Sequence, residues 1–230
     1  MHVIQGTWQF MSAMLLMSST PPVHTLADDL ESFLHVLSWV ALRFTPHGLS
    51  SKALTDLLVS MFDHSYEDDG YSRGGTAKRN NLIGAQILKS DFQHPILPAL
   101  LEELTATCAV RYEKSPPDKE LEAYHELQVQ QSDMLRNLFV QNSAAAKYER
   151  KIAALENSDW MIKTFNEALA DVSAWPSEDR SDPNPLYQRK LRGRKRKSED
   201  GDVMPNMPTQ RMRFTAPIPE DGEGESRETA

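Results

Sequence analysis

The chain has 230 residues and a formal net charge of −8, and its mean hydropathy of −0.52 is low for a wholly folded protein. Its single cysteine, Cys108, excludes an internal disulfide, and no apolar run reaches the roughly 18 residues of a membrane-spanning helix. The N-terminus lacks the basic start of a signal peptide. We therefore expect an intracellular protein without membrane contact, part of which is disordered.

The clearest helical pattern covers residues 26–44. Thr25 and Asp28 fit a capping box at its start, and Pro46 ends it. Little of this helix is polar, so the pattern predicts a helix that is buried on most sides. Apolar residues recur at spacings of three and four at Leu26, Leu30, Phe33, Leu37, Val40 and Phe44, of which we expect Leu30, Phe33, Leu37 and Val40 in the core.

The rest of the body also has helical patterns. No alternation of period two is long enough to indicate a strand, so the body is predicted to be all-α. Pro116 and Pro117 interrupt the chain between two groups of helices. The expected elements are helices at 50–62, 77–90, 95–112, 118–140, 143–156 and from 158 to about 175, with a loop at 63–76.

Sequence signals for catalysis and for metal binding are absent. Gly74 and Gly75 lack the spacing of a phosphate-binding loop, and the seven histidines show no metal-ligand spacing. His35 is more simply a hydrogen-bonded core histidine than a ligand, and Cys108 more simply a buried thiol than a nucleophile. We therefore predict no catalytic residue, no metal ligand and no cofactor in this chain.

Residues 177–230 have the composition of a disordered tail, with six prolines and 11 residues of each charge. A basic cluster occupies seven of the nine positions from 189 to 197 and predicts a nuclear-localisation signal bound by an import receptor. Nonspecific nucleic-acid contact or a merely solvated charge run are the alternatives. No aromatic residue interrupts the cluster to stack on bases, so nucleic-acid binding is the less favoured. The cluster comprises Arg189, Lys190, Arg192, Arg194, Lys195, Arg196 and Lys197.

Two short stretches resemble known proteins, namely GTWQFMSA at 6–13 and LADDLESFLHVL at 26–37. Together they are similar to a protein kinase from the end of its activation segment into the central helix of its C-terminal lobe. The DDLES run resembles casein-kinase-one-like kinases. Combined with GTWQFMSA, with RGG at 73–75 and with Lys78, it resembles more particularly the fungal-type protein kinase family, over about residues 3–110.

This resemblance implies a fold and a set of site residues. Residues 1–112 would be the helical C-terminal lobe without its N-terminal β lobe, and 113–176 a helical extension. Gly6, Thr7, Trp8 and Met11 would belong to the substrate-binding loop, with Thr7 contacting the catalytic aspartate of Ser/Thr kinases. Asp28 and Asp29 would start the central helix, and Asp29 would accept hydrogen bonds from the catalytic loop. Met14 stands where many kinases have a glutamate that pairs with an arginine.

The activity of the intact family is phosphoryl transfer from ATP with Mg²⁺ to protein. Its ATP-binding loop, strand lysine, catalytic-loop aspartate and metal-binding aspartate all precede the activation segment. Only five residues precede Gly6, and none of these motifs occurs later. We expect a truncated, pseudokinase-like chain that is inactive by itself. The alternative is a noncatalytic helical interaction or scaffold protein with a nuclear-targeting tail.

Overall fold

The computed structural model describes residues 7–19, 23–68, 70–129, 142–176 and 182–187. All of the described residues belong to one compact unit. The basic cluster at 189–197 and almost all of the tail predicted to be disordered lie outside the described residues. None of the described helices is long and apolar enough to span a bilayer.

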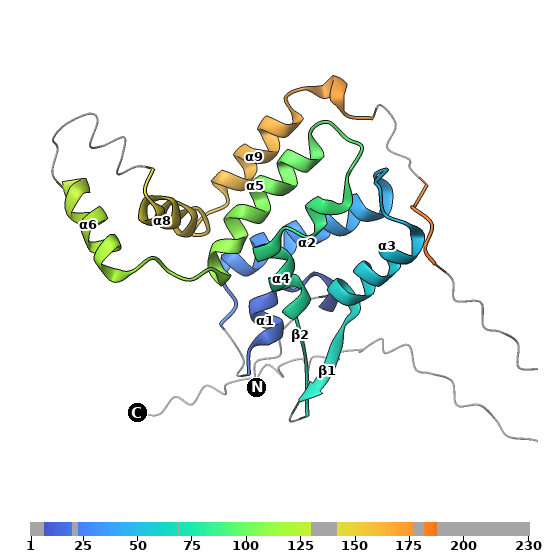
Figure 1. The fold of residues 1–230 in the computed structure, drawn as a ribbon, viewed down its shortest axis with the longest axis horizontal. Coiled ribbons are helices and arrows are strands. Elements are labelled where there is room, and N and C mark those ends of the chain that lie inside the picture. The colour runs from blue at the N-terminus through green and yellow to red at the C-terminus, as the bar shows by residue number, and fades with distance from the viewer. Residues whose placement is uncertain (1–6, 20–22, 69, 130–141, 177–181, 188–230) are drawn as a thin grey trace, which may run out of the picture. The chain divides into compact units, whose positions relative to one another are not determined.

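The described body is helical, which confirms the predicted all-α class (Figure 1). Short 3-10 or π turns extend several of the helices. The α-helices are α1 (Ala13–Met17), α2 (Leu26–Phe44), α3 (Ser51–Leu58), α4 (Thr76–Gly84), α5 (Leu97–Ala109), α6 (Asp118–Val129), α8 (Ala144–Ala154) and α9 (Asp159–Leu169), and the short turns are η1 (Trp8–Phe10), η2 (Val59–Asp63), η3 (Ile87–Ser90), η4 (Val110–Tyr112) and η5 (Val172–Ala174).

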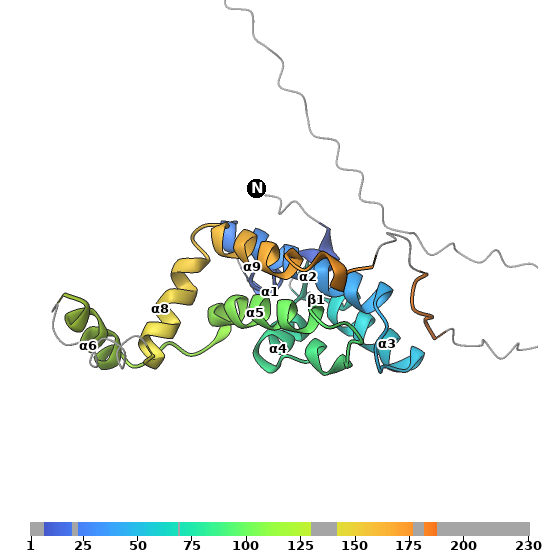
Figure 2. The ribbon, with the colours of Figure 1, turned by 90° about the horizontal axis from the view of Figure 1, so that it is seen from above.

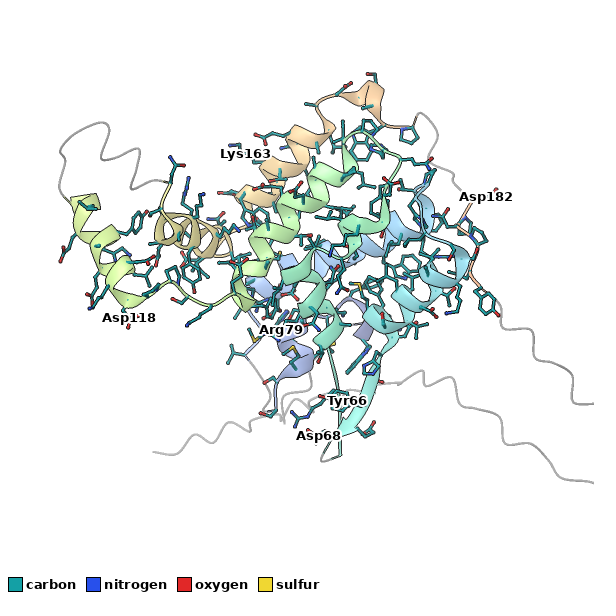
Figure 3. The ribbon with its side chains drawn as sticks, viewed as in Figure 1. Tyr66, Asp68, Arg79, Asp118, Lys163 and Asp182 are labelled. Carbon is teal, nitrogen blue, oxygen red and sulfur yellow. The ribbon has the colours of Figure 1, made fainter. Side chains whose placement is uncertain are left out.

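A β-hairpin replaces part of the predicted loop at 63–76. Strands β1 (Ser65–Asp68) and β2 (Tyr71–Gly74) pair antiparallel, with Tyr66 opposite Arg73. The hairpin projects from the helices, and Tyr66 and Asp68 lie on this projection (Figures 1 and 3). Each strand has only four residues, which is too short to produce a readable period-two pattern.

Helix α2 has the predicted bounds but buries a different side. The Asp28 carboxylate accepts a hydrogen bond from the Thr25 backbone N–H (2.9 Å), as in a capping box, and a second one from the Thr25 hydroxyl (2.8 Å). Leu30 is buried as predicted and Leu37 is half-buried. The prediction for Phe33 and Val40 is wrong, because these side chains are 63% and 41% exposed. The buried side instead combines leucines with four polar residues, Asp28, Glu31, His35 and Ser38.

The apolar core lies where α2, α4 and α5 pack together, and α9 runs alongside α5 (Figure 2). Cys108 lies within it, and burial raises the pKa of its thiol, so the thiol is protonated and inert as predicted. The most deeply buried large apolar side chains are Leu34, Leu42, Leu54, Phe62, Leu101, Leu104 and Val110.

A short segment of the predicted tail, residues 182–187, lies against the end of α2. The Asn184 side-chain amide donates hydrogen bonds to the carbonyl oxygens of Leu42 (2.9 Å) and Thr45 (2.8 Å). The Arg43 guanidinium donates a hydrogen bond to the Asn184 carbonyl oxygen at 2.8 Å. The Asn184 backbone N–H in turn donates to the Arg43 carbonyl oxygen. Asn184 therefore satisfies carbonyl groups that the last turn of a helix leaves without partners.

Candidate substrate loop and its buried charge network

The first described residues form a tight turn. The Thr7 carbonyl oxygen accepts hydrogen bonds from the N–H groups of Phe10 (2.8 Å) and Met11 (3.2 Å). Thr7 is exposed, whereas Trp8 and Met11 are half-buried. Gly6, the other residue predicted for the substrate-binding loop, lies outside the described residues. The structure thus gives Thr7–Met11 a fixed shape with an exposed hydroxyl at its start.

Lys78 on α4 binds the backbone of this turn. Its Nζ donates hydrogen bonds to the carbonyl oxygens of Met11 (2.7 Å) and Trp8 (3.2 Å), and the residue is 1% exposed. Burial lowers the pKa of the Lys78 ammonium to about 8, although the charge of Glu31 acts in the opposite direction. The ammonium is therefore charged at pH 7 and joins α4 to the turn.

Two glycines allow the hairpin and α4 to approach the turn closely. A Cβ on Gly74 would lie 2.7 Å from Cζ2 of Trp8 and 2.8 Å from the His64 carbonyl oxygen. Gly75 begins α4 with a φ of +84°, and a Cβ there would lie 2.9 Å from the Ala13 carbonyl oxygen. These contacts explain physically why RGG at 73–75 and Lys78 occur in one chain with GTWQFMSA.

Two carboxylates on the buried side of α2 hold α1. The Ser12 hydroxyl caps α1 by accepting from the Leu15 N–H, and it donates to Asp28 Oδ1 at 2.7 Å. The Ala13 N–H donates to Glu31 Oε1, also at 2.7 Å. Asp28 and Glu31 thus bind the start of α1 by direct hydrogen bonds, and both carboxylates are almost fully buried.

Arg111 and Tyr112, in the 3-10 turn after α5, complete the network. The Arg111 guanidinium donates to Asp28 Oδ1 (2.7 Å), Glu31 Oε2 (2.8 Å) and the Ala27 carbonyl oxygen (3.2 Å). The Tyr112 hydroxyl donates to Glu31 Oε2 at 2.6 Å and accepts from the Met14 N–H at 3.0 Å. The network therefore connects α1, α2 and the end of α5.

The network keeps both carboxylates ionised. Burial works against the Asp28 charge, but hydrogen bonds from Ser12, Arg111 and Thr25 outweigh it and hold the pKa of Asp28 below its ordinary value. Burial likewise opposes ionisation of Glu31, yet hydrogen bonds from His35, Tyr112 and the Ala13 N–H lower its pKa overall. Two buried cations, Arg111 and Lys78, balance these two negative charges.

His35 lies one helical turn beyond Glu31 and is 1% exposed. Its Nε2 lies 3.2 Å from Glu31 Oε1. Burial lowers the pKa of His35 below its ordinary value of 6.5, so the ring is neutral at pH 7 and donates a hydrogen bond rather than forming an ion pair. This agrees with the interpretation of His35 as a hydrogen-bonded core histidine.

Met14 departs from the kinase pattern, and the structure places a different acid in the same region. The Ala13 N–H donates to the Glu31 carboxylate, and the Met14 N–H donates to the Tyr112 hydroxyl, which in turn donates to Glu31. Glu31, from α2, pairs with Arg111. An acid–arginine pair therefore exists beside α1, but its acid comes from α2.

Asp29 has surroundings quite unlike those of Asp28. Its carboxylate is 53% exposed and lies 3.1 Å from Nε2 of His24, which is equally exposed. Asp29 also begins a row of exposed side chains along α2, at spacings of four, three and four residues. We call this row, which consists of Asp29, Phe33, Val36 and Val40, the α2 stripe. It lies on the opposite side of the helix from the buried network.

Sequence reasoning identified Asp28 and Lys78 but not Glu31, Arg111, Tyr112 or Ser12. One available signal was the spacing of Asp28, Glu31, His35 and Ser38, which places four polar residues on one side of an otherwise apolar helix. No local pattern indicates that Arg111, 80 residues further along the chain, pairs with Glu31.

A comparison with protein-family models matches residues 1–41 to the family described as fungal protein kinase. The matched segment includes the turn, α1 and most of α2. It ends before Lys78, Arg111 and Tyr112, which hold those elements in place. No curated protein and no solved structure matches the chain. The match supports a relationship to fungal protein kinases through the first 41 residues, in the segment that carries Thr7, Asp28 and Asp29.

Proposed function

We propose that this chain provides the substrate-binding side of a fungal-type Ser/Thr protein-kinase-like fold and acts together with a polypeptide segment that carries the ATP-binding and catalytic residues. The chain alone would not transfer phosphate. Three observations support the proposal: the family match over residues 1–41, the clamped Thr7–Met11 turn, and the α2 stripe.

The exposure of the α2 stripe is the observation that most strongly supports the proposal. In the kinases that this chain resembles, the aspartate at the position of Asp29 binds the catalytic loop, and the helix that follows is buried. Here Asp29 is half exposed, and Phe33 and Val40 in line with it are exposed apolar side chains. A row of apolar residues that starts at an acceptor for backbone N–H groups suits a protein segment as its binding partner.

The buried network gives the stripe a rigid support. Asp28 and Glu31 bind α1 and Arg111 from the opposite side of α2, so the orientation of the helix is fixed by several charged hydrogen bonds. The Thr7–Met11 turn is fixed to α4 by Lys78. A catalytic segment bound to the α2 stripe would therefore meet a substrate loop that is already ordered.

The experiment combines the full chain with the N-terminal lobe and catalytic loop of a fungal protein kinase, produced as a separate polypeptide. Calorimetry measures the association, and transfer of phosphate from Mg-ATP to a serine-containing peptide measures activity. The Phe33→Asp variant should abolish association, whereas Ile83→Asp, at another exposed apolar position, should leave it unchanged. A specific, Mg-dependent ATP site in the chain alone would contradict the proposal.

A noncatalytic scaffold is the second candidate, and the same stripe favours it. An apolar helix of a partner could occupy the α2 stripe without any phosphate transfer. The two functions differ in the experiment above. Association through Phe33 without activity would indicate the scaffold, whereas association with activity would indicate the kinase-like function.

A further inference from the structure

A cavity of about 570 Å³ lies between α5, α8 and α9, apart from the substrate loop and the α2 stripe. Its apolar lining includes Ile96 at the N-cap of α5, Leu100 on α5 and Ala168 on α9. From this N-cap to Thr107 the lining extends about 16 Å along the axis of α5. The cavity is therefore an elongated groove rather than a compact hole, and we call it the α5–α9 groove.

The groove has a positive charge in an acidic chain. Four cationic side chains line it, against the two carboxylates of Glu103 and Glu167. Glu167 already interacts with Lys163, at 3.7 Å. Lys147 and Lys151 form no ion pair with any of the described residues. The cations are Lys147, Arg150 and Lys151 on α8 and Lys163 on α9, the last of which is labelled in Figure 3.

Trp160 supplies a third feature of the groove. It belongs to the lining, and its indole Nε1 is shielded from solvent without an acceptor in the part of the chain that the structure describes. A buried N–H without an acceptor is unfavourable, and a ligand oxygen that reaches it would provide the missing hydrogen bond. The indole N–H and the lysines both favour a ligand that carries oxygen acceptors with negative charge.

From these features we propose that the α5–α9 groove binds an acidic amphipathic peptide segment of a partner protein. Each lining helix contributes side chains three or four residues apart, such as Leu100, Glu103 and Thr107 on α5. This repeat suits a ligand helix that places apolar side chains on the floor and carboxylates along the rim. Charge complementarity selects an acidic rather than a basic segment.

The test uses the full chain and a fluorescein-labelled 16-residue peptide with leucines along one helical face and glutamates elsewhere. Fluorescence anisotropy should show saturable binding that weakens as salt increases. Replacing every glutamate in the peptide by lysine should abolish binding. A peptide of the same composition with its leucines scattered should bind at least tenfold more weakly.

Variants of the chain locate the site. Lys151→Glu combined with Lys147→Glu should weaken binding at least tenfold, and Trp160→Phe should weaken it several-fold because the N–H donor is lost while an aromatic ring remains. Lys89→Glu, at an exposed lysine outside the groove, is the matched control and should have no effect. Equal loss of binding in the Lys89 variant, equal binding of the scattered peptide, or no binding of the acidic peptide would each overturn the proposal.

Discussion

The Glu31 carboxylate and the Arg111 guanidinium form a 2.8 Å ion pair between residues 80 positions apart, in which Glu31 is fully buried and the Arg111 side chain is 11% exposed. Asp28 accepts a second bond from the same guanidinium. This pairing joins the segment that matches fungal protein kinases to the end of α5, outside that segment. The fold around α1 therefore depends on Arg111 and on two buried acids.

Replacing Glu31 by glutamine should destabilise the fold strongly. The change leaves the buried Arg111 charge with one acid instead of two, and the loss should be about 3–5 kcal/mol in the free energy of unfolding. Urea denaturation followed by circular dichroism measures it. Asp29→Asn is the control, because its exposed contact with His24 contributes about 1 kcal/mol or less. Similar losses in both variants would contradict the central role of Glu31.

Stability should fall on acidification because of Asp28 and Glu31. Both have pKa values in the folded state below their ordinary values of 3.8 and 4.5, so the unfolded chain binds protons more readily. Their contribution is present above the ordinary values and is lost as pH falls through the lowered ones. Denaturation curves between about pH 5 and pH 3, around and below the ordinary values of the two carboxyls, should show this slope. In the Glu31→Gln variant the slope of stability against pH should be smaller. An unchanged slope would show that Glu31 does not contribute to the pH dependence.

Phe33 and Leu34 are neighbours on α2 but should respond very differently to truncation. Leu34 is 1% exposed, so Leu34→Ala should cost about 2–5 kcal/mol. Phe33 is 63% exposed, and Phe33→Ala should change stability by only about 0.5 kcal/mol. Thermal or chemical denaturation of both variants tests this. A large loss for Phe33→Ala would mean that the α2 stripe is covered in solution.

The helical pattern predicts the ends of α2 correctly but places Phe33 in the core, where it does not lie. The bounds of α2 and its capping box follow from Thr25, Asp28 and Pro46, which act locally. The side of α2 that is buried cannot be predicted from the sequence pattern, because the helix is apolar on nearly every side. Polar residues normally face water, but Glu31 is buried with hydrogen bonds from Ala13 on α1 and from Tyr112 beyond α5, and His35 is buried with a hydrogen bond to Glu31. Those partners are set by tertiary packing alone.

Asn184 should stabilise the end of α2. Its amide donates to the carbonyl oxygens of Leu42 and Thr45, so Asn184→Ala should cost about 1–2 kcal/mol. Asn80→Ala, at an exposed position of α4, is the matched control and should change stability by less than about 0.5 kcal/mol. If chemical denaturation finds the two variants equally stable, the Asn184 side chain contributes nothing to the stability of this end of α2.

The basic cluster at 189–197 should direct nuclear import. Seven cationic residues in nine suit an acidic receptor groove, and the acids that follow are screened over about 8 Å at physiological salt. The measurement is the cellular location of residues 177–230 fused to a fluorescent carrier too large to diffuse through nuclear pores. Alanine at Arg194, Lys195, Arg196 and Lys197 should abolish import. An equal cytoplasmic signal from both fusions would exclude a targeting role.

The burial of Lys78 also makes the rate of its chemical modification a measure of how often the Thr7–Met11 turn opens. With a pKa of about 8, a larger share of its amine is unprotonated at neutral pH than for an ordinary lysine, but its 1% exposure keeps reagents away while it holds Met11 and Trp8. Acylation of Lys78 can therefore proceed only during moments when the turn detaches from α4. The rate of its modification, compared with that of exposed Lys89, reports how often the loop opens, and a bound partner that fixes the loop would slow this rate.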